Sequence, residues 1–209
     1  MQIKNTPPIY EAVKKVKKHR EESNRDATRK LADTPTLFGE IRQPKTDYLL
    51  VPSTSSERRK YIPIGFISTD VISNNANLVV SNASLYELGV MTSNVHNAWM
   101  RAVCGRLKSD YRYSVKIVYN NFPWPAPTNE QKANIERTAQ AILDARALYP
   151  DCSLADLYDE LTMPVELRKA HQENDKAVME AYGFNWKNMT EADIVAELFK
   201  LYEQMTKSS

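Results

Sequence analysis

The chain has 209 residues with a net charge of +2, and 42% of them are hydrophobic and 26% charged, which suits one large or two small globular domains. No apolar run is long enough to cross a bilayer, and the first residues lack the apolar core of a secretory signal. Cys104 and Cys152 fit neither a disulfide framework nor a zinc site, so we expect a cytoplasmic protein with no membrane partner.

Glycine and histidine exclude several kinds of catalytic site. The five glycines are widely separated, so the chain has no Walker loop, no dinucleotide-binding loop and no glycine-rich motif for S-adenosylmethionine. The histidines His19, His96 and His171 lie far apart, and none has a second candidate metal ligand at a suitable spacing. The sequence therefore predicts no catalytic residue, bound cofactor or metal in this chain.

Charge is distributed unevenly along the sequence. Residues 1–126 contain 19 Lys and Arg against 11 Asp and Glu, whereas residues 127–209 contain 9 against 15. A basic half joined to an acidic half indicates two modules, of which the first suits a polyanion such as double-stranded DNA. The alternative is that the basic residues only solvate helix faces.

The first module begins with a helix and continues with strands. Two prolines and the spacing of Ile9, Val13 and Val16 predict a basic connector helix within residues 1–34 that ends near Asp33. Residues 46–52, 60–68 and 77–81 are short β-branched or aromatic runs between polar residues, which predicts strands. Pro63 places the second run at a sheet edge or a bulge.

Helices follow the strands. Residues 84–108 read as a helix that a step at residues 92–94 can divide, with Trp99, Val103 and Leu107 on its core face. Residues 110–127 read as extended, and residues 127–209 as helices, one of them ended by Gly183. We therefore expect an α+β fold: a small mixed sheet with flanking helices over residues 35–126, followed by a helical bundle over residues 127–209.

The segment Asn121-Phe122-Pro123-Trp124 is similar to the turn with which amino-methyltransferases hold a flipped base. Its second residue is Phe instead of Pro, and no cofactor motif precedes it. We interpret it as a proline-stiffened linker that holds one module against the next.

Two polar loops carry side chains suited to reading bases. Arg can bind guanine through two hydrogen bonds, Glu can accept from cytosine and Asn pairs with adenine. The candidate base-reading residues are Ser55, Glu57, Arg58, Arg59, Lys60, Asn74 and Asn75. The alternative for the first loop is that Glu57 and Arg58 pair with each other at a hairpin tip.

A second class of basic residues suits the phosphate backbone, which positions a protein on DNA without reading sequence. The candidate backbone-contacting residues are Arg42, Lys45, Arg101, Arg106, Lys108, Arg112 and Lys116.

Three long segments resemble one family of bacterial DNA methyltransferases, in the family's order. They are DTPTLFGEIRQPKTDYLLVPSTSSERRKYIPIGFIS, GVMTSNVHNAWMRAVCGRLKSDYRYSVKIVYNNFPWP and ILDARALYPDCSLADLYDELTMPVELRKAHQENDKAVMEAYGF. The first two resemble the target-recognition domain of the MmeI-like, type IIL (a subset of type IIG) restriction–modification proteins, and the third resembles their C-terminal helical domain. The resemblance covers the chain from about residue 7 to about residue 205.

The resemblance implies a DNA sequence-recognition module of an adenine-N6 methyltransferase that is not catalytic by itself. S-adenosylmethionine would then bind to the parent protein, in a methyltransferase domain upstream of this C-terminal fragment, and some parents also carry a nuclease. The base-reading residues would lie within 55–60 and 73–82. The alternative from another functional class is a protein-interaction adaptor whose acidic helical tail docks a partner.

Overall fold

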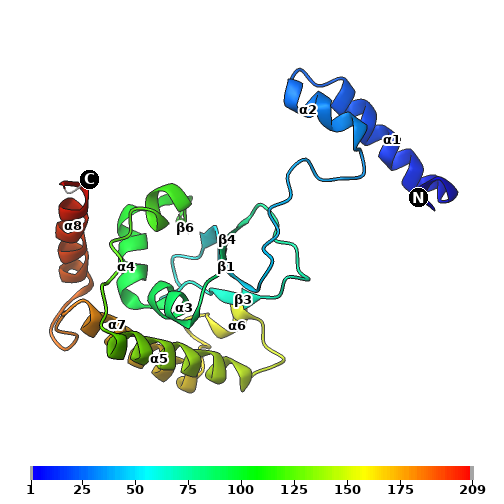
Figure 1. The fold of residues 1–209 in the computed structure, drawn as a ribbon. Helices are drawn as coiled ribbons and strands as arrows, with labels where there is room; N and C mark the ends of the chain where they lie inside the picture. Colours follow the sequence, from blue (N-terminus) through cyan, green and yellow to red (C-terminus); the bar gives the residue numbers. More distant parts are fainter. Residues whose placement is uncertain (1, 208–209) are drawn as a thin grey trace. The chain divides into compact units, whose positions relative to one another are not determined.

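The computed structural model describes residues 2–207 and divides into two compact units, one ending at Gln43 and one beginning at Pro44. Figure 1 shows the elements of each unit in chain order, and each unit is described by itself. Among the described residues, no helix combines the length and the apolar character that a membrane span requires.

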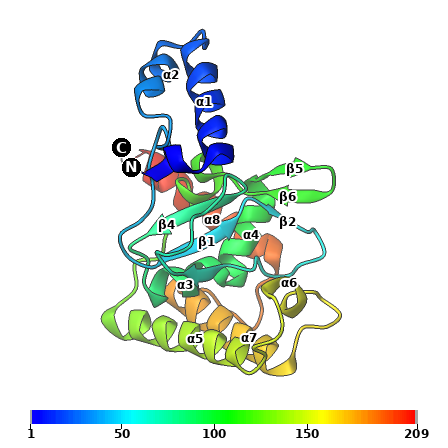
Figure 2. The same ribbon diagram turned by 90° about the vertical axis from the view of Figure 1, so that its right-hand side faces the viewer.

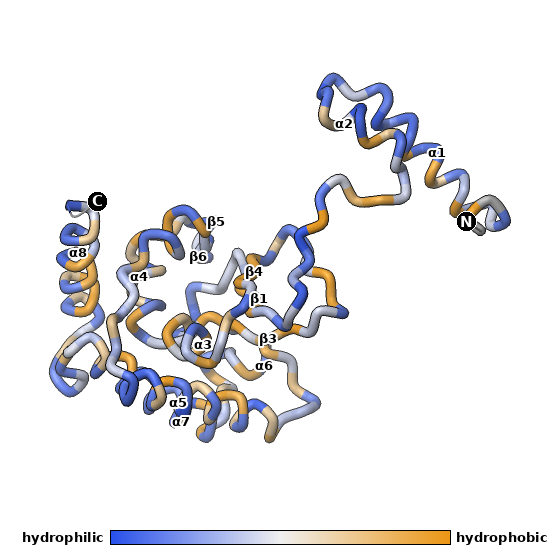
Figure 3. Tube along the Cα trace, viewed as in Figure 1, coloured by the Kyte–Doolittle hydropathy of each residue, from blue (hydrophilic) through white to orange (hydrophobic). Residues whose placement is uncertain are grey.

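The first unit is a short helical hairpin. Its elements are η1 (Gln2–Asn5), α1 (Pro7–Glu21), α2 (Asp26–Lys30) and η2 (Leu31–Asp33). The expected connector helix is therefore interrupted between α1 and α2. Here the Ser23 hydroxyl accepts a hydrogen bond from the backbone N–H of Arg25, which competes with the hydrogen bonds of a continuous helix. The Arg20 guanidinium holds the returning segment by donating to the carbonyls of Leu31, Thr34 and Leu37, at 2.8–2.9 Å. Isolated apolar positions lie among hydrophilic residues along α1 (Figure 3).

The strands form two small antiparallel sheets instead of the one mixed sheet that we expected. The first sheet has the order β3-β1-β4, with β1 at Tyr48–Pro52, β3 at Gly65–Ile67 and β4 at Asn77–Ser81. The second has the order β2-β6-β5, with β2 at Thr54–Ser55, β5 at Gly105–Leu107 and β6 at Asp110–Arg112. The α+β class is confirmed. Pro63 precedes β3, which lies at an edge as predicted.

Two helices, α3 (Leu85–Thr92) and α4 (Asn94–Val103), follow the first sheet. Ser84 and Glu87 form a capping box at the start of α3, and Ser93, within the step expected at residues 92–94, ends α3 and caps α4. Trp99 is 1% exposed and donates from Nε1 to the carbonyl of Val118 at 3.0 Å, which confirms it as a core residue. Val103 is half-buried against the same core.

The prediction for Leu107 is wrong. The helix ends at Val103, because Cys104 has an extended backbone, and the chain turns into the β5–β6 hairpin. Leu107 lies in β5 and is 50% exposed. In the sequence, apolar residues keep the helical spacing beyond Val103, so this pattern does not indicate where the helix ends and the chain turns.

Residues 110–127 are only partly extended. After β6 the chain makes the π-helical turn η3 (Val115–Tyr119), which the sequence did not predict. Phe122 is then fully buried, and the Tyr182 hydroxyl donates to the carbonyl of Pro123 at 2.7 Å. The segment therefore holds the helices after it against the core, as we interpreted it.

The last helices are α5 (Asn129–Ala147), α6 (Leu154–Leu157), α7 (Val165–Ala181) and α8 (Glu191–Lys207). Figure 2 shows α5 and α7 side by side beneath α3. Gly89 of α3 allows this approach, since a Cβ there would lie 2.6 Å from Cγ2 of Ile135 in α5. Gly183 lies just after the end of α7 and has φ +73°, the left-handed conformation of a glycine that terminates a helix, as its position predicted.

Candidate nucleic-acid interface

A polar loop of the second unit connects β2 to the segment before β3, and we call residues 56–60 the reading loop, after the base-reading role expected from the sequence. At its entry, Thr54 and Ser55 pair with Arg112 and Tyr111 of β6. The backbone N–H of Glu57 donates to the Asp110 carboxylate at 3.3 Å. The loop therefore begins on the same small sheet that carries the β5–β6 hairpin.

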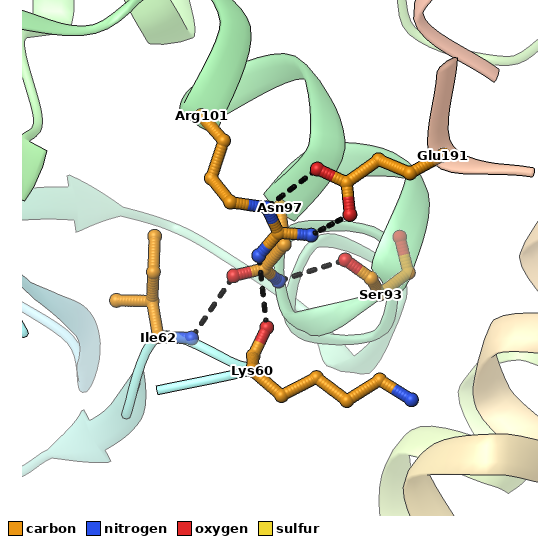
Figure 4. Close-up of polar contacts among 6 residues, drawn as sticks. All are labelled: Lys60, Ile62, Ser93, Asn97, Arg101 and Glu191. Carbon is orange, nitrogen blue, oxygen red and sulfur yellow. Dashed lines mark hydrogen bonds and ion pairs between the residues drawn. The ribbon is translucent and has the colours of Figure 1, made fainter. Parts of the chain in front are cut away.

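The exit of the reading loop is held by helix α4 (Figure 4). Arg101 donates from Nη1 to the carbonyl of Lys60 at 3.1 Å, and Asn97 accepts through Oδ1 from the backbone of Ile62 at 3.0 Å. The Asn97 amide also donates to the carbonyl of Ser93 at 2.8 Å, which fixes its orientation. Asn97 thus forms a buried bridge between α4 and the exit of the reading loop.

The tip of the reading loop exposes charged side chains. No side-chain hydrogen bond or ion pair engages Glu57, Arg58 or Arg59 in the part of the chain that the structure describes. The alternative pairing of Glu57 with Arg58 is likewise absent from residues 2–207. These side chains and Lys60 border an open pocket of about 360 Å³. A charged group with no partner in the protein is available to one outside it.

Cations on the β5–β6 hairpin lie next to the entry of the reading loop. Arg106 stacks on Tyr111, with its guanidinium carbon 4.0 Å from the ring centroid, and donates to the carbonyl of Ser109 at 2.8 Å. Lys108 lies at the turn with φ +58°, and both Lys108 and Arg112 are exposed. The hairpin therefore presents fixed positive charge beside the loop, which is suited to phosphate contacts.

The second polar loop is a turn before β4. The Asn74 side-chain oxygen accepts from the backbone of Ala76 at 3.0 Å and from the Asn77 amide at 2.8 Å. Both of its lone pairs are therefore used inside the protein, whereas Asn75 is exposed. Ser53 connects this turn to the second sheet, because its hydroxyl donates to Ala76 at 2.7 Å and its carbonyl accepts from Tyr113 at 2.9 Å.

The other predicted residues differ from one another in exposure and in their partners within the protein. Ser55 is 4% exposed, so its side chain is shielded, and Arg101 is 17% exposed and fully engaged. Lys45 and Lys116 are exposed. Arg42 belongs to the first unit and pairs with Glu40 at 2.7 Å.

A buried polar cluster behind the exit of the loop was not predicted. The Tyr61 hydroxyl donates to Oδ2 of Asp175 at 2.7 Å, and the backbone of Asn94 donates to Oδ1 at 2.7 Å. The ring of Tyr61 stacks on His171 at 4.2 Å, and His171 hydrogen-bonds through Nε2 to Tyr158 at 2.7 Å. The helical spacing of His171 and Asp175 with buried Leu167 and Val178 was the available signal.

Burial shifts the pKa values of this cluster. Loss of hydration raises the pKa of Asp175 to about 6, although two hydrogen bonds to its carboxylate act in the opposite direction. Burial lowers the pKa of His171 well below its usual value. The described residues contain no group of three or more potential metal ligands. The side chains of this cluster are neutral or hydrogen-bonded to one another, and they join the exit of the reading loop to α7.

Family models match the whole of this arrangement. Residues 1–126 match the model described as the MmeI target recognition domain, and residues 127–208 match that of the MmeI C-terminal domain.

Two relatives agree with these matches. The chain is 41% identical over 205 residues to DNA methyltransferase A of Bacillus subtilis (strain 168), which covers 98% of this chain and 23% of that protein. It is also similar to the solved structure of the type IIL restriction–modification enzyme MmeI in complex with DNA. That match has 51% sequence identity and a TM-score of 0.88, and it covers 96% of this chain and 27% of that one. The chain thus spans about a quarter of each relative's length. It belongs to the family of MmeI target recognition domains, joined to the C-terminal domain of the same proteins.

Proposed function

We propose that this chain reads DNA sequence for a site-specific adenine-N6 methyltransferase of a restriction–modification system. The observation that carries the proposal is a loop anchored at both ends whose tip presents Glu57, Arg58 and Arg59 without partners in the described protein. Glu can accept from the amino group of cytosine, and Arg can donate twice to guanine. Glu57 and Arg59 are therefore suited to reading the two bases of one C·G pair.

The hairpin supplies the second half of a DNA interface. Arg106, Lys108 and Arg112 lie on the β5–β6 hairpin, and β6 pairs with β2, the strand that leads into the reading loop, so phosphate contacts there would set the register of the loop on the duplex. The names of the relatives, a DNA methyltransferase and a restriction–modification enzyme in complex with DNA, support this assignment.

We propose that the catalytic site lies outside this chain. The chain spans only about a quarter of its relatives, and its sequence lacks both a glycine-rich loop and the turn that holds a flipped base. We propose that S-adenosylmethionine and the catalytic residues belong to a methyltransferase domain of the same longer polypeptide, acting in the cytoplasm.

A salt titration tests the proposal. Binding to a fluorescent duplex should weaken steeply with salt, and Lys108→Ala and Arg112→Ala should each lower the slope of log affinity against log salt by roughly one unit. Lys200→Ala is the control, because that lysine belongs to α8 and not to the hairpin, and pairs with Glu197 of the same helix. A protein-interaction adaptor would show no salt-dependent DNA binding, and that result would contradict the proposal.

A further inference from the structure

The exit of the reading loop is joined to helices of the C-terminal domain as well as to α4. Arg101 donates to Oε1 and Oε2 of Glu191 at 2.7 and 2.8 Å while it donates to the carbonyl of Lys60 at 3.1 Å (Figure 4). Glu191 begins α8, within the part that matches the MmeI C-terminal domain. We propose that Arg101 and Glu191 are positioning residues that fix the reading loop in the place where its tip discriminates bases. This inference rests on the proposed function.

The Arg101 side chain and the backbone of Glu191 are both held in place by their surroundings. The Arg101 side chain is mostly buried, and its planar guanidinium makes two side-by-side hydrogen bonds to one carboxylate and a third to a carbonyl, a geometry that an ammonium group cannot reproduce. Glu191 is in the first turn of a helix capped by Thr190, whose hydroxyl accepts from Asp193 at 3.3 Å and donates to its carboxylate at 2.7 Å. The position of Glu191 is therefore transmitted to the Lys60 carbonyl.

A second link from the C-terminal domain holds Tyr61, the residue after Lys60. Asp175 of α7 accepts from the Tyr61 hydroxyl and from the first residue of α4, both at 2.7 Å. The carboxylate therefore fixes the loop exit and the helix carrying Arg101 relative to each other. Lys60 and Tyr61, the two residues after the loop tip, both depend on groups from residues 127–208.

We expect a shift of the loop exit to affect base recognition and phosphate contacts differently. Two-hydrogen-bond contacts to bases require close alignment, so a loop that shifts at its exit loses discrimination. The phosphate-facing cations lie on the β5–β6 hairpin, which the Arg101–Glu191 link does not touch. Breaking the link should therefore reduce base preference and leave general DNA affinity unchanged.

The test compares base preference among variants of the full-length protein. The probe is a pool of duplex oligonucleotides with a randomised central segment, and sequencing of the bound fraction gives the preference at each base position. The variants are Arg101→Lys, which keeps the charge, and Glu191→Gln, which keeps the size. Glu197→Gln is the matched control, because it removes another ion pair of α8, with Lys200.

We expect Arg101→Lys and Glu191→Gln to reduce preference at one or two positions by roughly tenfold, with unchanged affinity for a duplex lacking the preferred site. Glu197→Gln should match the wild type. Partial unfolding would lower both affinities by the same factor and leave their ratio unchanged, so the ratio separates positioning from stability. Wild-type preference in both variants would overturn this inference alone. Absence of any base preference in the wild type would instead contradict the proposed function.

Discussion

Trp99 is a fully buried side chain of α4 that packs against α8. Its ring lies 5.2 Å from Phe199 and 6.3 Å from Phe122, and its indole N–H has a buried carbonyl partner. Trp99→Ala should lower the free energy of unfolding by about 3–5 kcal/mol, because it removes buried area and leaves a cavity. Denaturant titration followed by far-UV circular dichroism measures this loss. A loss below about 1 kcal/mol would contradict the assignment of Trp99 to the core.

Asp175 and the buried histidines give opposite pH dependences. Burial lowers the pKa of His96 to about 3 and also lowers that of His171, so each destabilises the fold as the pH falls below the usual histidine value of 6.5. Asp175 does the reverse, because its folded pKa of about 6 lies above the ordinary value of 3.8. It contributes stability below about pH 4, and this contribution is lost as the pH rises to about 6.

Asp175→Asn should therefore make acid destabilisation steeper between pH 6 and pH 4. The amide can still accept from the backbone of Asn94 and can donate to the Tyr61 hydroxyl, so the hydrogen bonds are largely retained. The added loss across this interval should be on the order of 1–3 kcal/mol, measured as unfolding free energy against pH. Equal slopes in variant and wild type would show that Asp175 does not titrate in this interval.

At the scale of elements, Gly89 sets the distance between α3 and α5. A Cβ at this position would also lie 3.2 Å from the carbonyl oxygen of Ile135, which cannot move aside easily. Gly89→Ala should therefore destabilise the protein by about 1–3 kcal/mol despite the better helix propensity of alanine.

The control is Gly105→Ala in β5, where the nearest atom to an added Cβ is Cβ of Arg112 at 4.0 Å. Thermal unfolding of the two variants compares a crowded site with an open one. If Gly89→Ala unfolds at or above the wild-type temperature, the close approach of the two helices is not required.

The sequence predicted most elements but few of their boundaries. The helix that begins at residue 84, its step at residues 92–94 and the strand-like runs were readable because their chemistry is local. The exposed Leu107 and the π-helical turn Val115–Tyr119 were not, because tertiary packing decides where α4 ends and how the chain leaves β6. The sequence also showed which loop is charged, but not that its exit is held by Asn97, Arg101 and Asp175, which lie 35 to 114 residues from the residues that they bind.

For the whole molecule, the charge asymmetry matches the two tasks that we propose. The basic part carries the reading loop and the hairpin, whereas the acidic part supplies Asp175 and Glu191, which hold the loop exit. The compact unit from Pro44 onward contains both, so the two matched family regions share one core. We therefore expect a recognition module without the C-terminal helices to lose both fold and specificity.

The central claim is that Glu57 and Arg59 read a base pair, and mapping of DNA methylation across the genome of cells expressing the full-length protein tests it most directly. Replacing Glu57 with Lys and Arg59 with Asp reverses the donor and acceptor pattern of the loop tip. The account predicts methylation at a motif that differs from the wild-type motif at one position, since one such contact provides about 1–3 kcal/mol of discrimination. An unchanged motif at normal protein levels would contradict it, and would direct attention to the turn that carries Asn75.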